Sequence, residues 1–285
     1  MSQVLDDLSS LLELEVIEQG IYRGQSQDLG FRALFGGQVM GQAVSAAQET
    51  VDSARNVHSL HSYFLRPGDA SKPVVYEVEN IRDGKSFSTR RVKAIQNGKD
   101  IFYMTASFQQ YEKGIEHQDL MPDVPAPEDL ASYTDFIFDN QDKIPEEIRG
   151  KFLAEKPIEM RPVKPYNWLQ PEKTAPKSQM WIKANGTLSD DLRIHTYMLA
   201  YTSDFLFLPT ALFPHGLSHW QPNLQIATID HAMWFHRPFR FDDWLLYVMD
   251  SPSASGGRGL VKGQIFNRQG QLVASTMQEG VVRQR

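Results

Sequence analysis

The chain contains the same run of features twice, and this internal repeat limits the possible folds more than any other feature. Tyr63-Phe64-Leu65-Arg66-Pro67 is matched by Trp234-Phe235-His236-Arg237-Pro238 in the second half of the chain. Each run is followed by a basic segment of strand character, a hairpin turn and a last strand that closes on Gln109 or Gln278, at nearly the same offset. Ordered similarity at such a distance indicates two copies of one structural unit. Duplicated units can diverge, so that only one of them carries chemistry.

Each copy combines helical periodicity with strand patterns. In the first, residues 3–14 and the segment after Gly36-Gly37 have helical spacing, and Asn97-Gly98 predicts a hairpin turn. Strands are expected over residues 15–23, 74–78, 88–95 and 101–109. In the second copy, an apolar helix over 191–207 lies among expected strands over 180–184, 225–235, 244–249, 259–266 and 272–281. The pattern predicts an α+β fold in which an antiparallel sheet wraps around a long helix, twice.

Residues 113–176 separate the two copies and differ from both in composition. They hold nine of the sixteen prolines of the chain, and proline is excluded from helix interiors and regular strand pairing. We therefore expect an N-terminal unit over 1–112, a proline-rich linker over 113–176 and a C-terminal unit over 177–285. Aromatic residues such as Phe136 and Trp168 predict that parts of the linker pack on the units, and a short helix is expected within 135–152.

Composition narrows the class of partner and the compartment. The net charge of −6 argues against bulk affinity for nucleic acid or anionic membranes, so an anionic ligand would need a local basic site. The chain has no cysteine, which excludes disulfides and a thiol nucleophile and suits a reducing compartment. No apolar run approaches the roughly 20 residues that span a bilayer. A basic leader and a Ser-Lys-Leu ending are also missing, so we expect a cytoplasmic protein without membrane insertion.

Familiar catalytic motifs are absent. Gly216-Leu217-Ser218-His219-Trp220 fails the last position of the nucleophile elbow, and Gly36-Gly37-Gln38-Val39-Met40-Gly41 lacks the dinucleotide spacing. No His-Glu-x-x-His zinc motif occurs, so the sequence predicts neither a metal nor a cofactor. Asp230 and His231 are neighbours, and on a strand they would face opposite sides, which weakens them as a cooperating pair.

Three polar residues of the second copy are candidates for chemistry. Asp204 lies in an apolar helical context, where a carboxylate is costly unless it is bonded or functional; the alternative is that it faces solvent or caps a turn. Thr228 offers a hydroxyl, although threonine is common in strands for packing reasons. Gln278 offers an amide that can hold water or an oxyanion, or it is an exposed strand residue. At the offset of the two Arg-Pro pairs Thr228 aligns with Val57, so a site built from the three would exist in the second copy alone.

His58 and His61 are the alternative acid–base candidates, because histidine titrates near neutral pH. Their spacing in a strand predicts that they face opposite sides, and hydrogen bonding without catalysis is the alternative role for each. Basic side chains on the expected strands are either solvated or bind phosphates. They are Arg66, Arg90, Arg91, Lys93, Arg237, Arg258 and Lys262.

Five motifs taken together resemble the bacterial acyl-coenzyme A thioesterase II family, over nearly the full chain. They are Phe35-Gly36-Gly37-Gln38-Val39, His58-Ser59-Leu60-His61-Ser62-Tyr63-Phe64-Leu65-Arg66-Pro67-Gly68, Ile226-Ala227-Thr228-Ile229-Asp230-His231, Trp234-Phe235-His236-Arg237-Pro238 and Ala274-Ser275-Thr276-Met277-Gln278-Glu279-Gly280. The resemblance implies a double hotdog fold, two antiparallel sheets each wrapped around a long helix. It also implies hydrolysis of fatty acyl-CoA thioesters to free acid and coenzyme A, over a broad range of chain lengths.

The resemblance places the family's catalytic trio on Asp204, Thr228 and Gln278, with water as nucleophile, and implies a homo-oligomer, a dimer or tetramer, without cofactor. Two other functions are open to such a fold. A hotdog hydratase or dehydratase needs an Asp-x-x-Pro-x-His spacing, which the sequence after Asp204 breaks, because its proline comes at Pro209. An acyl-CoA binding module without chemistry would bind substrate and not turn it over. Within the enzyme hypothesis, His58 is the alternative base.

Overall fold

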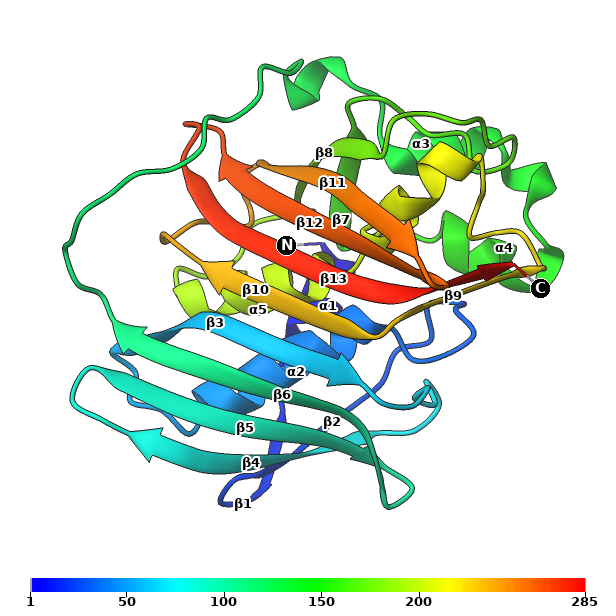
Figure 1. The fold of residues 1–285 in the computed structure, drawn as a ribbon. Helices are drawn as coiled ribbons and strands as arrows, with labels where there is room; N and C mark the ends of the chain where they lie inside the picture. The colour runs from blue at the N-terminus through cyan, green and yellow to red at the C-terminus, as the bar shows by residue number, and fades with distance from the viewer. Residues whose placement is uncertain (1, 285) are drawn as a thin grey trace.

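The computed structural model describes residues 2–284, and within this range thirteen strands form one antiparallel sheet. The strand order is β1-β2-β4-β5-β6-β3-β10-β13-β12-β11-β8-β7, with β9 paired to β13 (Figure 1). Helices α2 and α5 lie together behind the sheet as it is seen in Figure 1. The predicted α+β architecture is confirmed, and the two expected sheets join edge to edge through β3 and β10.

The first unit follows the predicted order of helix and antiparallel strands. Its elements are α1 (Gln3–Leu12), β1 (Glu15–Glu18), β2 (Ile21–Gly24), α2 (Gly36–Gln48), β3 (Arg55–Phe64), β4 (Val74–Asp83), β5 (Phe87–Gln96) and β6 (Lys99–Gln110). The prediction of one strand over 15–23 is wrong, because Gly20, at φ 75°, turns the chain between β1 and β2. The hairpin at Asn97-Gly98 is confirmed, with both residues at positive φ as a tight two-residue turn requires.

The second unit repeats the order. Its elements are β8 (Lys177–Ala184), α5 (Leu192–Thr202), the 3-10 helix η3 (Leu208–His215), β9 (Leu224–Thr228), β10 (Asp230–Phe235), β11 (Leu245–Ser255), β12 (Arg258–Asn267) and β13 (Leu272–Gln284). The helix expected over 191–207 is shorter than predicted. It ends at Thr202, and Leu206, at φ 55°, then turns the chain into η3. Asp204 therefore lies in a tight turn after the helix and not in a helix interior.

The two units meet along an antiparallel pair of helices. Gly37 lies against the carbonyl of Tyr201 and Gly41 against that of Tyr197, so α2 and α5 run in opposite directions. A Cβ at Gly37 would overlap the Tyr201 carbonyl oxygen, which explains the need for glycine at this close approach. As a result, the N-terminus of α2 faces the C-terminus of α5. Nearly every residue of α2 is buried, and the two helices form the centre of the hydrophobic core.

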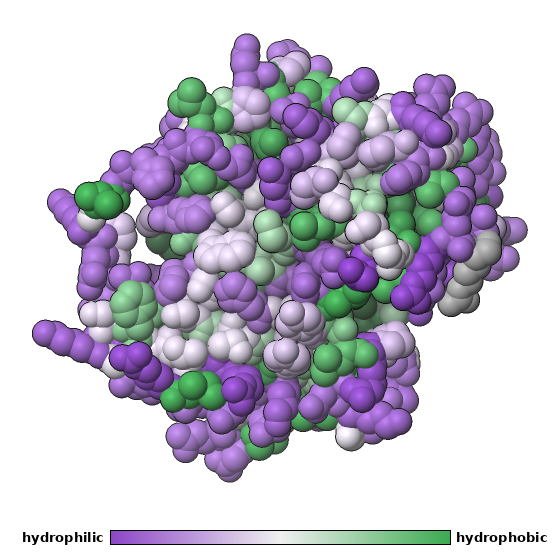
Figure 2. All heavy atoms as spheres, viewed as in Figure 1, coloured by the Kyte–Doolittle hydropathy of each residue, from purple (hydrophilic) through white to green (hydrophobic). Residues whose placement is uncertain are grey.

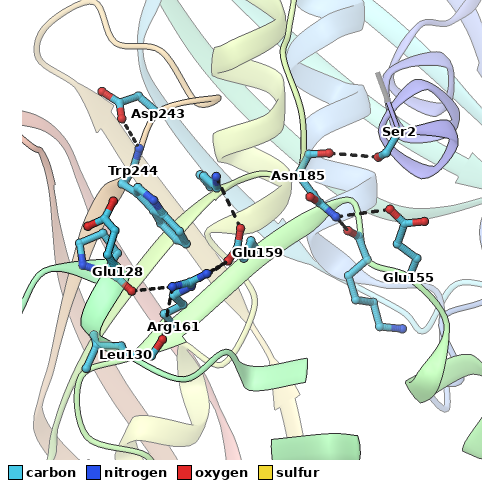
Figure 3. A network of polar contacts seen from close by, with 12 residues as sticks. Ser2, Glu128, Leu130, Glu155, Glu159, Arg161, Asn185, Asp243 and Trp244 are labelled. Atoms are coloured by element: carbon cyan, nitrogen blue, oxygen red, sulfur yellow. Dashed lines mark hydrogen bonds and ion pairs between the residues drawn. The ribbon is translucent and has the colours of Figure 1, made fainter. Parts of the chain in front are cut away.

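The proline-rich segment crosses from β6 to the second unit and packs on it (Figure 1). It contains η1 (Pro127–Asp129), α3 (Tyr133–Asp139), η2 (Gln141–Lys143), α4 (Glu146–Leu153) and β7 (Ile158–Pro162). It therefore holds two short α-helices where one was expected. Arg161 on β7 bonds Glu159 and donates hydrogen bonds to the carbonyls of Pro127 (2.7 Å) and Leu130 (3.3 Å), which fixes the segment to the sheet edge (Figure 3).

The outer face of the sheet is mostly polar, and its exposed hydrophobic residues are scattered (Figure 2). Tyr63 and Tyr103 stack on this face with ring centroids 5.6 Å apart. Within residues 2–284, none of the helices has the length and apolar character required to cross a membrane.

Candidate active site

Asp204 lies where the two units meet, in the turn that follows α5. The backbone N–H of Gly37, in the first turn of α2, lowers the pKa of its carboxyl, so the first unit stabilises a charge carried by the second. Most of the carboxyl is buried, and part of Asp204 stays exposed. Burial raises the pKa of Asp204, although nearby His231 and the donors Gln278, Thr228 and Gly37 oppose the shift.

Thr228 and Gln278 complete a chain of hydrogen bonds to this carboxylate. The Thr228 hydroxyl donates to Asp204 Oδ1 at 3.3 Å, and the Gln278 amide nitrogen donates to Thr228 Oγ1 at 2.7 Å. The Gln278 amide also lowers the pKa of Asp204. Thr228 ends β9, and Gln278 lies on the adjacent β13. The structure therefore brings together the three residues that the sequence singled out, although they lie far apart along the chain.

His231 extends this chain into the core and was set aside in the sequence analysis. Its Nδ1 lies 2.6 Å from Gln278 Oε1, and its Nε2 lies 3.1 Å from the hydroxyl of Ser203, the residue before Asp204. The side chain is fully buried, and burial lowers the pKa of His231 despite the opposing charge of Asp204. Successive side chains of β10 point to opposite faces of the sheet, so the alternation that separates His231 from Asp230 also directs His231 into the core. An alignment of β10 with β13 from the sequence would have identified His231, because it lies opposite Gln278 on the neighbouring strand.

The direction of each hydrogen bond follows from the carboxylate. An ionised Asp204 only accepts, so Thr228 must donate to it and must accept from the amide nitrogen of Gln278. The Gln278 carbonyl then faces His231 and requires a proton on Nδ1. The single proton of the Ser203 hydroxyl is shared between the Ala200 carbonyl, at 2.9 Å, and Nε2 of a neutral imidazole, at 3.1 Å. One consistent polarity thus runs from His231 through Gln278 and Thr228 to Asp204.

His58, the alternative base, lies on the other face of the sheet. Its Nε2 is 2.8 Å from the hydroxyl of Ser107, which alternates with the buried Ala106 and Phe108 and so faces away from the core. A bulge between Val57 and Ser59 rotates His58 to this face. The prediction that His58 and His61 face opposite sides is therefore wrong, because His61 is exposed and packs on Trp234 on the same outer face. Burial lowers the pKa of His58, which has no contact with Asp204, Thr228 or Gln278.

The basic residues on the predicted strands are occupied by partners within the chain. Arg90 is buried against Asp83, and the others bond carboxylates or carbonyls near the surface. These partners are Asp100 for Arg66, Glu79 for Arg91, Glu77 for Lys93, Glu116 for Arg237, Glu279 for Arg258 and Asp250 for Lys262. Arg32 is exposed in the loop before α2, and no ion pair of Arg32 occurs within residues 2–284. Its neighbour Phe31 packs on Phe35, which in turn packs on Phe205 of the Asp204 turn.

The strand register corrects the sequence match between Gln109 and Gln278. Leu60 pairs with Ala106 in the first unit, and in the second the corresponding His231 lies opposite Gln278. The counterpart of Gln278 is therefore Ala106 and not Gln109. The two glutamines lie 169 positions apart, whereas the ladder, which has one extra residue in the second hairpin, requires an offset of 172, so the sequence match is three residues out of register. A misaligned register moves a side chain to the other face of a sheet.

A sheet wrapped around a pair of antiparallel helices defines a double hotdog fold. The family described as acyl-CoA thioesterase matches residues 148–281, and the family described as acyl-CoA thioesterase N-terminal domain matches residues 25–109. Acyl-CoA thioesterase 2 of Haemophilus influenzae is 47% identical over 283 residues, which are 99% of either chain.

Solved structures agree with this assignment. The acyl-CoA thioesterase II TesB2 of Mycobacterium marinum is 43% identical, with a TM-score of 0.80 over 98% of either chain. A protein with a hot dog fold from Alicyclobacillus acidocaldarius, 18% identical, has a TM-score of 0.79 over the full length of both chains and supports the fold alone. The chain belongs to the acyl-CoA thioesterase II family, and its reaction is the hydrolysis of acyl-CoA thioesters. The hydratase alternative is thereby set aside.

Proposed function

We propose that Asp204 activates a water molecule that attacks the thioester carbonyl of a fatty acyl-CoA. The observation that carries the proposal is that Thr228, Gln278 and the Gly37 N–H converge on the Asp204 carboxyl, most of which is buried. The oxygen of the water forms the new bond to carbon, and its proton passes to Asp204. The carbon–sulfur bond then breaks, and the thiolate of coenzyme A takes up the proton. General-base help of this kind contributes about 10²–10⁴-fold.

In this proposal the N-terminus of α2 and the Gln278 amide stabilise the oxyanion that forms during the attack. The first backbone N–H groups of a helix lack partners within the helix, and those of Gly36 and Gly37 lie beside Asp204. A donor of this type is worth roughly 10²–10³ in rate. In this proposal the unit over 177–285 supplies the side chains that act on the water. The unit over 1–112 supplies the helix end.

The acyl chain would lie in a cavity of about 210 Å³ beside the Asp204 turn. Leu206 of the turn lines it, together with Met180 of β8 and Phe213 of η3. The segment over 113–176 closes it with residues that include Tyr166 and Trp168. Because these walls are largely apolar and partly made by a separate segment, we expect broad chain-length tolerance. Leu206→Trp should shift the preference toward short acyl chains; an unchanged profile would remove this cavity from the proposal.

We further propose that the protein acts in the cytoplasm as a homo-oligomer, a dimer or tetramer. The absence of cysteine suits a reducing compartment. Exposed hydrophobic residues on the outer sheet face supply material for a contact between copies. They are Tyr63, Phe87, Tyr103 and Met277, each at least 37% exposed. Light scattering at working concentration tests the oligomer, and a monomer would contradict it.

The test of the mechanism is release of free thiol from a panel of short to long acyl-CoA esters, by the wild type and Asp204→Asn. Asparagine keeps the shape of the side chain and cannot accept the proton of the water. We expect turnover by the wild type and a loss of about 10²–10⁴-fold in kcat for the variant, with the folded state checked by circular dichroism. Turnover that survives in Asp204→Asn would refute the role of Asp204. Binding of acyl-CoA without turnover by the wild type would favour the binding module.

A further inference from the structure

The amide of Gln278 has no fixed orientation of its own, and its environment has to select one. In the proposed mechanism its nitrogen must face Thr228 and Asp204, because a flipped carboxamide would direct its oxygen at the carboxylate. The group that decides between the two orientations is the one that meets Oε1. In this structure that group is His231, whose Nδ1 lies 2.6 Å from Oε1.

His231 is itself held on several sides. Its Nε2 lies 3.1 Å from the Ser203 hydroxyl, and its backbone carbonyl accepts a hydrogen bond of 2.7 Å from Ser62 Oγ of the neighbouring strand. Its ring packs on Phe207 with centroids 5.7 Å apart. Both His231 and Gln278 are fully buried, so no water competes for the Gln278 carbonyl at this side. The imidazole is thus a rigid donor with a single accessible partner.

The first unit supplies a comparison within the same molecule. The residue at the position of Gln278 is Ala106, and the residue at the position of His231 is Leu60. Both are buried in the hydrophobic core. Histidine is therefore present in the unit that has the amide and absent from the unit that lacks it. If the histidine only filled space in the core, its presence would not be expected to depend on the presence of the amide.

We propose that His231 is a positioning residue that donates from Nδ1 to Gln278 and fixes the amide with its nitrogen toward Thr228 and Asp204. This inference rests on the proposed role of Gln278 in the hydrolysis. His231 does not touch the water or the thioester. Its effect reaches the reaction through the orientation of one amide, so its loss should lower kcat and leave KM for acyl-CoA unchanged.

Two substitutions of similar size separate the two ring nitrogens. In His231→Asn the amide nitrogen can take the place of Nδ1 and still donate to Gln278. In His231→Gln the amide nitrogen falls near the place of Nε2, and the donor to Gln278 is lost. We expect His231→Gln to lose about 10- to 10²-fold in kcat, the cost of misplacing a catalytic group by about 1 Å, and His231→Asn to keep most of the activity. His231→Leu, which copies the first unit, should behave like His231→Gln.

A double-mutant cycle with Gln278→Ala separates positioning from general damage to the fold. Once the amide is gone, His231→Gln has nothing left to orient and should cause no further loss in kcat. Thermal melting of each variant confirms the folded state. Equal activity of His231→Asn, His231→Gln and the wild type would overturn the proposal, and so would a loss from His231→Gln that is undiminished in the Gln278→Ala background. If Gln278→Ala itself kept full activity, the proposed role of Gln278 would fail, and the inference with it. If instead Gln278→Ala were impaired and His231→Gln kept full activity, the role of Gln278 would stand and only the role of His231 would fail.

Discussion

The two units of this thioesterase share one backbone arrangement but differ in polarity at four corresponding positions. Where the second unit has polar residues that bond one another, the first has side chains that belong to the hydrophobic core or bond elsewhere. The pairs, second unit first, are Asp204 and Thr50, Thr228 and Val57, His231 and Leu60, and Gln278 and Ala106. The paired helices place the N-terminus of α2 at Asp204, so the candidate site of the second unit also depends on the first.

Arg90 shows how the first unit has changed. It lies opposite Ala106, where the second unit has Val261 opposite Gln278. Its buried guanidinium bonds Thr50 Oγ1 (2.8 Å), the Thr50 carbonyl (2.9 Å) and Asp83 (2.8 Å). A cation with fixed partners therefore occupies the region where the second unit keeps a carboxylate available. The difference teaches that the same framework can hold a buried ion pair at one position and a carboxylate of the candidate site at its counterpart.

After Asp204→Asn, Gln278→Ala should give the largest effect on kcat. It converts the second unit to the residue of the first at this position and removes the amide beside Asp204. We expect kcat to fall roughly 10²–10³-fold, the loss typical of one such donor, measured by thiol release. Gln109→Ala is the matched control, because Gln109 lies on the outer face and bonds only Glu112, at 3.5 Å. An equal loss in both variants would refute the assignment of Ala106 as the counterpart of Gln278.

Arg90→Met tests the stabilising role of the first unit. Methionine keeps much of the volume and leaves the carbonyls of Thr50 and Arg82 without their donor. Because a buried group without a partner costs about 1–3 kcal/mol, we expect the free energy of unfolding to fall by this amount. Urea denaturation measures it, and kcat of the folded variant should be unchanged. Loss of turnover at unchanged stability would mean that the first unit has a direct part in catalysis.

The carboxylates of the two regions should respond to pH with opposite sign. Burial raises the pKa of Asp204 above its ordinary value of 3.8, so ionising it opposes folding, and its stabilising contribution is lost as pH rises through the raised pKa. Hydrogen bonds from Ser88 and Arg90 lower the pKa of Asp83, whose contribution is present above pH 3.8 and lost as pH falls through the lowered pKa. At pH 8, Asp204→Asn should therefore raise the melting temperature and Asp83→Asn should lower it.

Melting curves from about pH 2 to 8 check both signs, and the effects of Asp204→Asn and Asp83→Asn should both shrink toward low pH. The same raised pKa predicts that kcat/KM rises with pH as Asp204 ionises, since only the carboxylate can accept the proton of the water. If Asp83→Asn raised the melting temperature at pH 8, or Asp204→Asn lowered it, the pKa values of the two carboxyls would not be shifted in opposite directions.

Much of this comparison could be predicted from the sequence, because periodicity and turn chemistry act locally. The repeat predicted two units, the Asn97-Gly98 turn was placed correctly, and Thr228 was matched to Val57. The end of α5 at Thr202 was missed because the residues that follow are as apolar as the helix. His231 was missed because its partners Ser203 and Gln278 lie 28 and 47 positions away, and only the strand ladder brings them together. The match of Gln109 to Gln278 was wrong because it lies three residues from the register of the ladder, which only the strand pairing reveals.

The smallest effect is expected at Arg32, where the first unit again serves the site of the second. Arg32 is exposed in the loop that packs, through Phe31 and Phe35, on the Asp204 turn, and we propose that it meets a phosphate of coenzyme A. Because the contact is exposed and screened, Arg32→Ala should raise KM for acyl-CoA by about 2- to 5-fold, the range of a surface ion pair. The increase should shrink at high salt, while kcat stays unchanged. Arg91→Ala, on the outer face and paired with Glu79, is the control that should leave KM as it is. If KM changed neither with salt nor in Arg32→Ala, Arg32 would not bind the coenzyme. The first unit would then contribute the N-terminus of α2 to this site and no charged side chain.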